Sequence, residues 1–249
     1  MKRTVLFTLL CIFLVPIFGS TTLGGSSGYI VVPSAEVAPS EVHSSVTTAY
    51  SATITSGKVI HIPSILLSFS DTVESSFAVD IGNDIDLLLN GKWRFTKRET
   101  TSFAAGVLAQ VSGVSNTNKL SAQLYVASTF ASSIMDLPSK TTLRLGYTFK
   151  KPMTSNIDFA LGFQTPFFPE VFKEKVDFLL DFGNVSYSTT PSAGNAGDRG
   201  LVNVALRLLP VEFLTATYFG LDIRALDLFD HEGRALSIGA TISFRPQLQ

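Results

Sequence analysis

The sequence has little cysteine and little charge, and each shortage excludes a class of protein. Cys11 is the only cysteine among 249 residues, so neither a disulfide framework nor a thiolate metal site can hold the fold. The 19 basic and 20 acidic residues nearly cancel, which argues against a nucleic-acid partner. Charged residues make up only 16% of the chain. Soluble domains usually carry about a quarter.

Long apolar runs are missing after the N-terminus. Residues 1–20 combine a basic start (Lys2, Arg3), the apolar run Val5–Phe18 and the small residues Gly19–Ser20, which is typical of a secretory signal peptide. An uncleaved anchor is the alternative. No later window supplies the roughly 18 apolar residues that a membrane helix needs. Cleavage would remove Cys11, so we predict an exported, cysteine-free protein.

The clearest pattern that is present lies near the C-terminus, in Ala235–Arg245 (ALSIGATISFR). Strand side chains alternate between two faces, and this stretch places apolar residues on one face and small or polar residues on the other. A final strand that alternates and ends in Phe is typical of an outer-membrane β-barrel. We predict that the barrel-assembly machinery recognises its apolar face through Ile238, Ile242 and Phe244.

The same alternation recurs along most of the chain. No helical period lasts long enough to compete with it. Bacterial barrels use even numbers of antiparallel strands of about this length. We predict an all-β fold, an antiparallel transmembrane β-barrel of about 12 strands (roughly 10–14), with residues 21–45 as a lead and residues 46–249 as the barrel. The predicted strands are Val46–Ile54, Val59–Ser70, Val73–Ile81, Asp84–Thr96, Phe103–Val111, Leu120–Phe130, Thr142–Lys150, Ile157–Gln164, Lys175–Phe182, Leu201–Pro210, Phe213–Arg224 and Ala235–Arg245.

A secreted β-sandwich or lipocalin-like barrel would also alternate. In such a protein the polar face meets water and is rich in Lys and Glu. Here that face is mostly Ser, Thr, Gly, Ala and Gln, and aromatic residues such as Trp93 and Phe95 gather near strand ends, as in membrane-interface girdles. The pattern favours the transmembrane barrel, with outer-membrane lipid as its surroundings.

An even number of strands places both ends of the barrel on the periplasmic side. The long connections Tyr187–Arg199 and Ala225–Arg234 then face outward, and the composition of Thr190–Gly200 predicts a flexible one. Short periplasmic turns are predicted at Asp71–Thr72 and Pro210–Val211. Longer periplasmic connections are predicted at Ser132–Lys140 and Thr165–Glu174, and Pro63 suggests a bulge.

The inward phase carries charges of both signs. A Lys or Arg facing lipid near the midplane would cost about 2–4 kcal/mol, so a barrel forces these residues inward. Two interpretations remain open: a polar channel whose charges select solutes, or a salt-bridge network that fills a narrow lumen. The predicted lumen-lining charges are Asp80, Asp84, Asp86, Lys92, Arg94, Arg144, Lys150, Asp158, Lys175, Asp177, Asp181, Arg207, Asp222 and Arg224.

The lead, rich in Gly, Ser and Pro, suits a periplasmic handle, a lumenal plug or an extra strand equally well. Its stretch GSSGYIVVPSAEVAPSE, with Gly25, Gly28 and Pro33–Ala35, resembles the opening of YjbH-like outer-membrane barrels. Gly91–Val107 and Leu201–Asp222 also resemble strands of that group. The chain is shorter than those proteins and has Glu41 where a glycine is common. The resemblance implies an outer-membrane barrel, associated in some members with exopolysaccharide export, and brings no catalytic residues.

Enzyme chemistry has little support. Some outer-membrane lipid hydrolases pair Ser with His, but only His43, His61 and His231 are available, and no nucleophile elbow, metal spacing or phosphate loop appears. We therefore predict no enzyme activity, no metal and no cofactor. The leading hypothesis is a pore for small polar solutes. The alternative is a non-conducting barrel linked to envelope or exopolysaccharide export.

Overall fold

The computed structural model describes residues 21–38, 44–116, 118–152, 156–196, 200–230 and 233–246. The predicted signal peptide with Cys11, together with His43 and His231, lies outside the described residues. The described part of the chain contains no helix long and apolar enough to cross a membrane.

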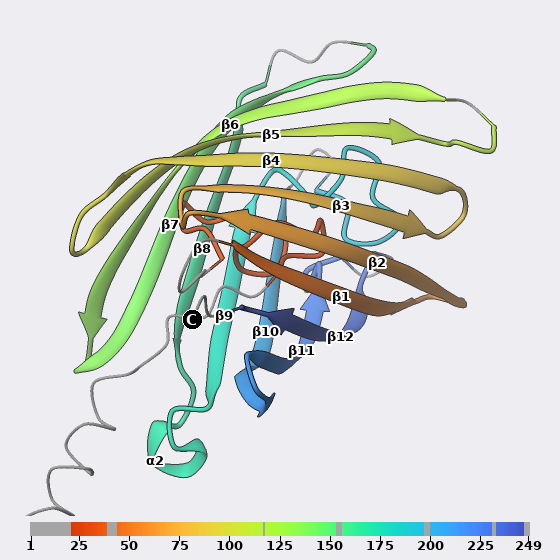
Figure 1. Cartoon of the computed structure of the whole chain (residues 1–249). Helices are drawn as coiled ribbons and strands as arrows, with labels where there is room; N and C mark the ends of the chain where they lie inside the picture. The colour runs from red at the N-terminus through yellow and green to blue at the C-terminus, as the bar shows by residue number, and fades with distance from the viewer. Residues whose placement is uncertain are drawn as a thin grey trace, which may run out of the picture.

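The described residues form twelve antiparallel strands that close into one barrel, as the alternation predicted. Each strand pairs with its neighbours in sequence, and β12 closes the barrel by pairing with β1 from Val46 opposite Phe244 to Ile54 opposite Leu236 (Figure 1). The strands are β1 (Ser44–Thr55), β2 (Lys58–Phe69), β3 (Val73–Ile81), β4 (Ile85–Lys97), β5 (Thr101–Ser112), β6 (Lys119–Ile134), β7 (Leu137–Phe149), β8 (Asp158–Pro166), β9 (Val176–Gly183), β10 (Leu201–Leu214), β11 (Thr217–Leu226) and β12 (Ala235–Phe244).

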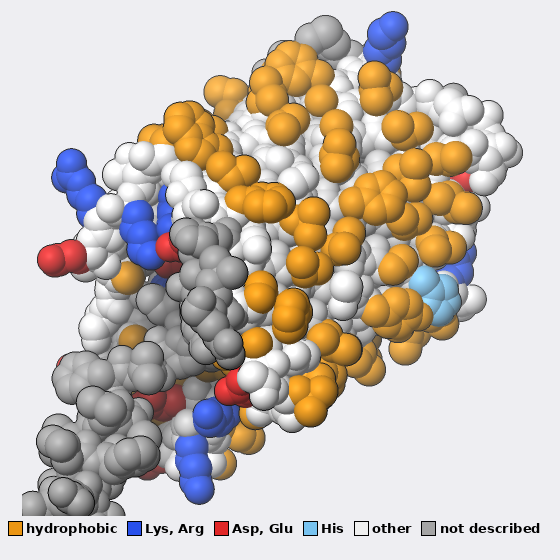
Figure 2. Space-filling model, viewed as in Figure 1, with side chains coloured by type: hydrophobic (Ala, Val, Ile, Leu, Met, Phe, Trp, Pro, Cys, Tyr) orange, Lys and Arg blue, Asp and Glu red, His pale blue; other side chains and the backbone are white. Residues whose placement is uncertain are grey.

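The outer surface of the barrel is apolar. On β12 buried and exposed positions alternate, with Ile238, Ile242 and Phe244 all pointing outward and each about half exposed. Figure 2 shows hydrophobic side chains spread over the visible face, with Lys and Arg at its margins. An apolar exterior of this kind belongs in lipid. A closed barrel pairs its backbone groups between strands and leaves no open edge there.

The periplasmic end carries mostly tight turns. The segment Ser132–Lys140, predicted as a long connection, is instead the end of β6, a turn at Met135–Asp136 and the start of β7. The connection after β8 is longer, as predicted, and contains the single helical turn α2 (Pro169–Phe172). Local alternation in Ser132–Lys140 is weak because the last five positions of β6 are all exposed and do not alternate between two environments.

Two predictions based on proline are wrong. Pro63 causes no bulge: it pairs with Tyr50 in an unbroken β1–β2 register. Pro210–Val211 is not a turn, because β10 runs on to Leu214 and the chain reverses after it. Instead, the β10–β11 register shifts by one residue between Leu208 and Val211. This bulge accommodates Pro210, which has no backbone N–H to donate to the neighbouring strand.

The barrel is filled from both ends. Residues 21–38, here called the inner segment, lie inside the lumen and are almost entirely buried (Figure 1). Residues 184–200, between β9 and β10, are called the inserted loop. Its described part also folds inward, burying Val185–Ser188, Ala193 and Ala196. The prediction of a flexible outer connection therefore does not describe this loop, because its small side chains pack against the lumen wall.

Candidate functional site: the filled lumen

Eleven of the fourteen predicted lumen charges are buried on the inward face. The other three lie beyond strand ends, where alternation no longer fixes side-chain direction. Asp84 is in the β3–β4 turn, Lys150 follows β7 at the outer rim, and Lys175 precedes β9 on the periplasmic side. Lys150 and Lys175 are exposed and Asp84 is partly so. The placement of Lys175 and Asp84 in the lumen is therefore wrong, whereas Lys150 lies at its outer mouth and lines the outer hollow.

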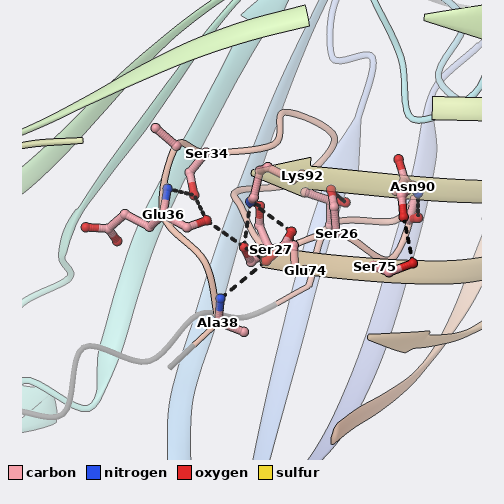
Figure 3. Close-up of polar contacts among 12 residues, drawn as sticks. Ser26, Ser27, Ser34, Glu36, Ala38, Glu74, Ser75, Asn90 and Lys92 are labelled. Atoms are coloured by element: carbon pink, nitrogen blue, oxygen red, sulfur yellow. Dashed lines mark hydrogen bonds and ion pairs between the residues drawn. The ribbon is translucent and has the colours of Figure 1, made fainter. Parts of the chain in front are cut away.

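The predicted set of lumen charges omits Glu74 on β3, although this residue is buried and shares the inward phase of Asp80. Its carboxylate lies 2.8 Å from the Lys92 ammonium, and both side chains are fully buried. The same carboxylate accepts hydrogen bonds from the Ser27 N–H at 2.9 Å and the Ser27 hydroxyl at 2.6 Å. Lys92 in turn donates to the Ser27 carbonyl oxygen at 3.0 Å. This ion pair thus holds the inner segment at Ser27, with the carboxylate accepting from it and the ammonium donating to it (Figure 3).

Asp181 on β9 holds the middle of the inner segment. One carboxylate oxygen accepts hydrogen bonds from three successive backbone N–H groups, those of Ile30 at 3.0 Å, Val31 at 2.5 Å and Val32 at 3.0 Å. Successive N–H groups that converge in this way form an anion-binding concavity, and here the anion is a fixed side chain.

Arginines hold the carbonyl oxygens of the same segment. Arg207 donates to the oxygen of Gly28 at 2.9 Å and of Tyr29 at 2.7 Å. Asp222 bridges Arg207 at 2.6 Å and Arg224 at 2.7 Å, so the two cations share one buried carboxylate. Gly28 is required here, because a Cβ at this position would lie 2.3 Å from the Val32 oxygen.

The inserted loop closes the lumen from the outer side. The Tyr187 hydroxyl donates to Asp80 at 2.7 Å, and the Ser192 N–H donates to the same carboxylate oxygen at 3.0 Å. Burial, together with the Asp80 carboxylate, raises the pKa of Tyr187, which keeps it a neutral donor. The inserted loop and the inner segment are neighbours, because a Cβ added to Gly24 would lie 3.2 Å from the backbone carbonyl oxygen of Tyr187.

Two spaces remain between these insertions and the strands. An outer hollow of about 180 Å³ is lined by polar side chains, including Lys150, Asp158 and Thr148. A smaller cavity of about 10 Å³, enough for one water-sized body, is lined by Arg144, Tyr125 and residues of the inner segment. Gln123 and Ser186 line both spaces, so the two are adjacent.

The structure offers no catalytic pair at His61, the one histidine among the described residues. His61 lies on the lipid-facing side of β2, and its Nδ1 is 2.5 Å from the Tyr50 hydroxyl. A tyrosine hydroxyl in that place suits a membrane-interface girdle better than a Ser–His hydrolase. Within the described ranges, no group of three His, Cys, Asp or Glu residues is placed to hold a metal ion.

Comparisons with known proteins agree with this architecture. No protein-family model and no curated protein sequence matches the chain. Among solved structures, the NanC porin is similar over 81% of this chain and 100% of its own, with a TM-score of 0.52 at 12% identity. The KdgM porin is similar over 81% of this chain and 99% of its own, with a TM-score of 0.51 at 10% identity. The chain therefore has the fold of an outer-membrane β-barrel, and with its apolar exterior it is located in that membrane.

Proposed function

We propose that this protein is an outer-membrane channel for small polar solutes, and that the inner segment closes it. The observation that carries this proposal is the path of polar space in the lumen. The outer hollow is lined by Lys150, Asp158 and Gln123. The smaller cavity, which Gln123 also lines, lies between Arg144 and residues of the inner segment. Polar space thus extends from the outer rim toward the segment that blocks the lumen. The barrel fold shared with porins is consistent with this function.

The contacts that close the lumen are of a reversible kind. Asp181, Arg207 and the Asn90 amide bind the backbone of the inner segment, and water can replace each of these hydrogen bonds. If the segment leaves, the wall that it uncovers carries charged side chains such as those of Glu74 and Lys92, which water hydrates readily. Displacement of the segment would therefore open a hydrophilic passage.

One observation favours the second candidate, a non-conducting barrel. Leu23, Tyr29, Ile30, Val31 and Val32 of the inner segment pack in an apolar cluster with inward residues of the strands. Burying an aliphatic or aromatic side chain of this size contributes about 1.5–3 kcal/mol, so the closed state is favoured strongly. A permanently filled barrel would serve as a structural or interaction protein, and envelope polysaccharide export is the role that the YjbH-like resemblance suggests.

Planar-bilayer conductance of protein purified from outer membranes separates the two functions. We expect few openings in the wild type and discrete steps in a variant lacking residues 21–38. Gly28→Ala should also increase opening, because the added Cβ meets backbone atoms of Val32, Pro33 and Ser34 within 3 Å. Gly91→Ala is the matched control, since its Cβ meets only a Val107 methyl group at 3.7 Å.

Reversal potentials in a salt gradient then show whether the wall charges select ions. If the deletion and Gly28→Ala variants fold as heat-modifiable barrels yet stay silent, the channel proposal fails and the non-conducting barrel replaces it.

A further inference from the structure

Arg144 on β7 is a buried cation that the fold does not fully satisfy. Its side chain is 1% exposed, and Nη2 donates to the Gln123 oxygen at 3.0 Å. Nε and Nη1 are buried without a hydrogen-bond partner among the described residues. Buried polar groups nearly always have partners, so two idle donors on one guanidinium group indicate that something else binds there.

The surroundings of Arg144 favour an anion. The Tyr125 ring lies 4.5 Å from the guanidinium carbon, and the buried Tyr125 hydroxyl also lacks a partner among the described residues. Both side chains line the 10 Å³ cavity, together with neutral residues such as Thr22 and Ser26. No acidic residue is among the described residues that line this cavity. The cavity thus presents unpartnered hydrogen-bond donors and one positive charge, which is the arrangement that an anion prefers.

The size of the cavity limits the anion. One water-sized body fits, which suits a single carboxylate oxygen in contact with the guanidinium group. The three terminal oxygens of a phosphate or sulfate head would not fit. The adjacent outer hollow is large enough and polar enough for the rest of a small hydrophilic molecule, and Gln123, which is hydrogen-bonded to Arg144, lines both spaces.

We propose that Arg144 is an anion-binding residue of the lumen and that it takes the carboxylate of a small polar solute arriving through the outer hollow. This inference rests on the proposed channel function and names its class of solute. Binding requires the Gln123 side chain to rotate away from Arg144. Lys150 at the outer rim adds a second positive charge on the approach. Asp158, the acidic residue of that hollow, is hydrogen-bonded to the Thr148 hydroxyl at 2.5 Å.

Acetate is a suitable probe, and saturation-transfer NMR on its methyl signal reports binding to the full protein purified from outer membranes. Acetamide, a neutral molecule of the same shape, is the ligand control. We expect binding of acetate and not of acetamide. Arg144→Gln should weaken acetate binding at least tenfold, and Arg144→Lys should weaken it less. Lys97→Gln removes an equal charge from an exposed periplasmic position and should leave binding unchanged.

Gln123→Ala provides a second variant. It opens the wall between the two spaces, and we expect acetate to bind at least as tightly as to the wild type. Each variant is first checked as a heat-modifiable barrel. The proposal is overturned if the folded wild type gives no acetate signal, or if acetate binds equally well to Arg144→Gln, since Arg144 would then only be hydrated.

The two proposals fail separately. If the wild type binds acetate but the variant lacking residues 21–38 shows no conductance, the anion site is supported and the channel function is rejected. Conductance without acetate binding would retain the channel and reject Arg144 as an anion site.

Discussion

Replacing Asp181 by Ala tests whether the lumen is closed by a few polar contacts. The change removes the one oxygen that accepts hydrogen bonds from the N–H groups of Ile30, Val31 and Val32. A hydrogen bond to a charged group contributes about 1.5–3 kcal/mol, and three independent bonds would sum to more than 4 kcal/mol. Since a single oxygen serves all three donors, we take about 3 kcal/mol as the loss. The undocked state of the inner segment should gain about a hundredfold in population, at 1.4 kcal/mol per factor of ten.

Two measurements follow this population. Amide hydrogen exchange over residues 21–38 should be about a hundredfold faster in Asp181→Ala, because exchange tracks the open population, and bilayer recordings should show more frequent opening. Asp181→Asn keeps an acceptor oxygen and should fall between the two proteins. Asp177→Ala is the matched control. It removes the same group from the same face of β9, but that carboxylate accepts its hydrogen bond from Gln164 on β8. Equal exchange rates in Asp181→Ala and Asp177→Ala would refute the assignment of Asp181 as the residue that holds the segment.

Three further predictions concern assembly, stability and pH. Phe244→Ala should lower the amount of heat-modifiable barrel in the outer membrane, and an unchanged amount would remove Phe244 from the assembly signal. Asp222→Ala leaves both arginines that it bridges buried without that partner, and should lower the free energy of unfolding in detergent and urea by about 3–5 kcal/mol; a loss under about 1 kcal/mol would contradict this. In the β3–β4 turn, the Ile85 N–H and the Asn116 amide lower the pKa of Asp84 below its ordinary 3.8. Because the pKa of Asp84 is lower in the folded than in the unfolded chain, its ionised carboxylate stabilises the turn at pH values above the unfolded-state pKa. This stabilisation is lost as the pH falls through the folded-state pKa. The NMR shift of the Asn116 amide should therefore titrate below pH 3.8, and a midpoint above that value would be inconsistent with this pairing.

The strands could be predicted because their signal is local. In β12 the identity of each residue depends on whether it faces lipid or lumen, and this choice repeats every second residue. The same rule placed Lys92, Arg144 and Asp181 inward. It failed at Asp84 and Lys175, which lie past strand ends. Proline preference failed at Pro210, where we expected a turn and the structure has a bulge inside β10.

The partners of the inward charges could not be predicted, because they are distant in sequence. Ser27 meets Glu74 across 47 residues, and Ile30 meets Asp181 across 151. The inner segment has no periodic pattern, and most of these contacts are made by its backbone groups, with the Ser27 hydroxyl as an addition. No residue type signals such a contact. Arg144 was identified as an inward charge, but its unpartnered nitrogens are visible only once its neighbours are in place.

Local alternation alone is enough to predict a barrel of about twelve strands, the face of each strand that points inward, and a place in a membrane. Lipid imposes these features residue by residue, so they are written in the local alternation. What fills the barrel became clear only with the folded chain. Closing the sheet brings Asp181, Arg207 and Glu74 around one space, and the inner segment and inserted loop enter it because their exposed N–H and C=O groups find charged partners there. Whether the lumen is open or closed thus depends on long-range contacts that no short stretch of sequence contains.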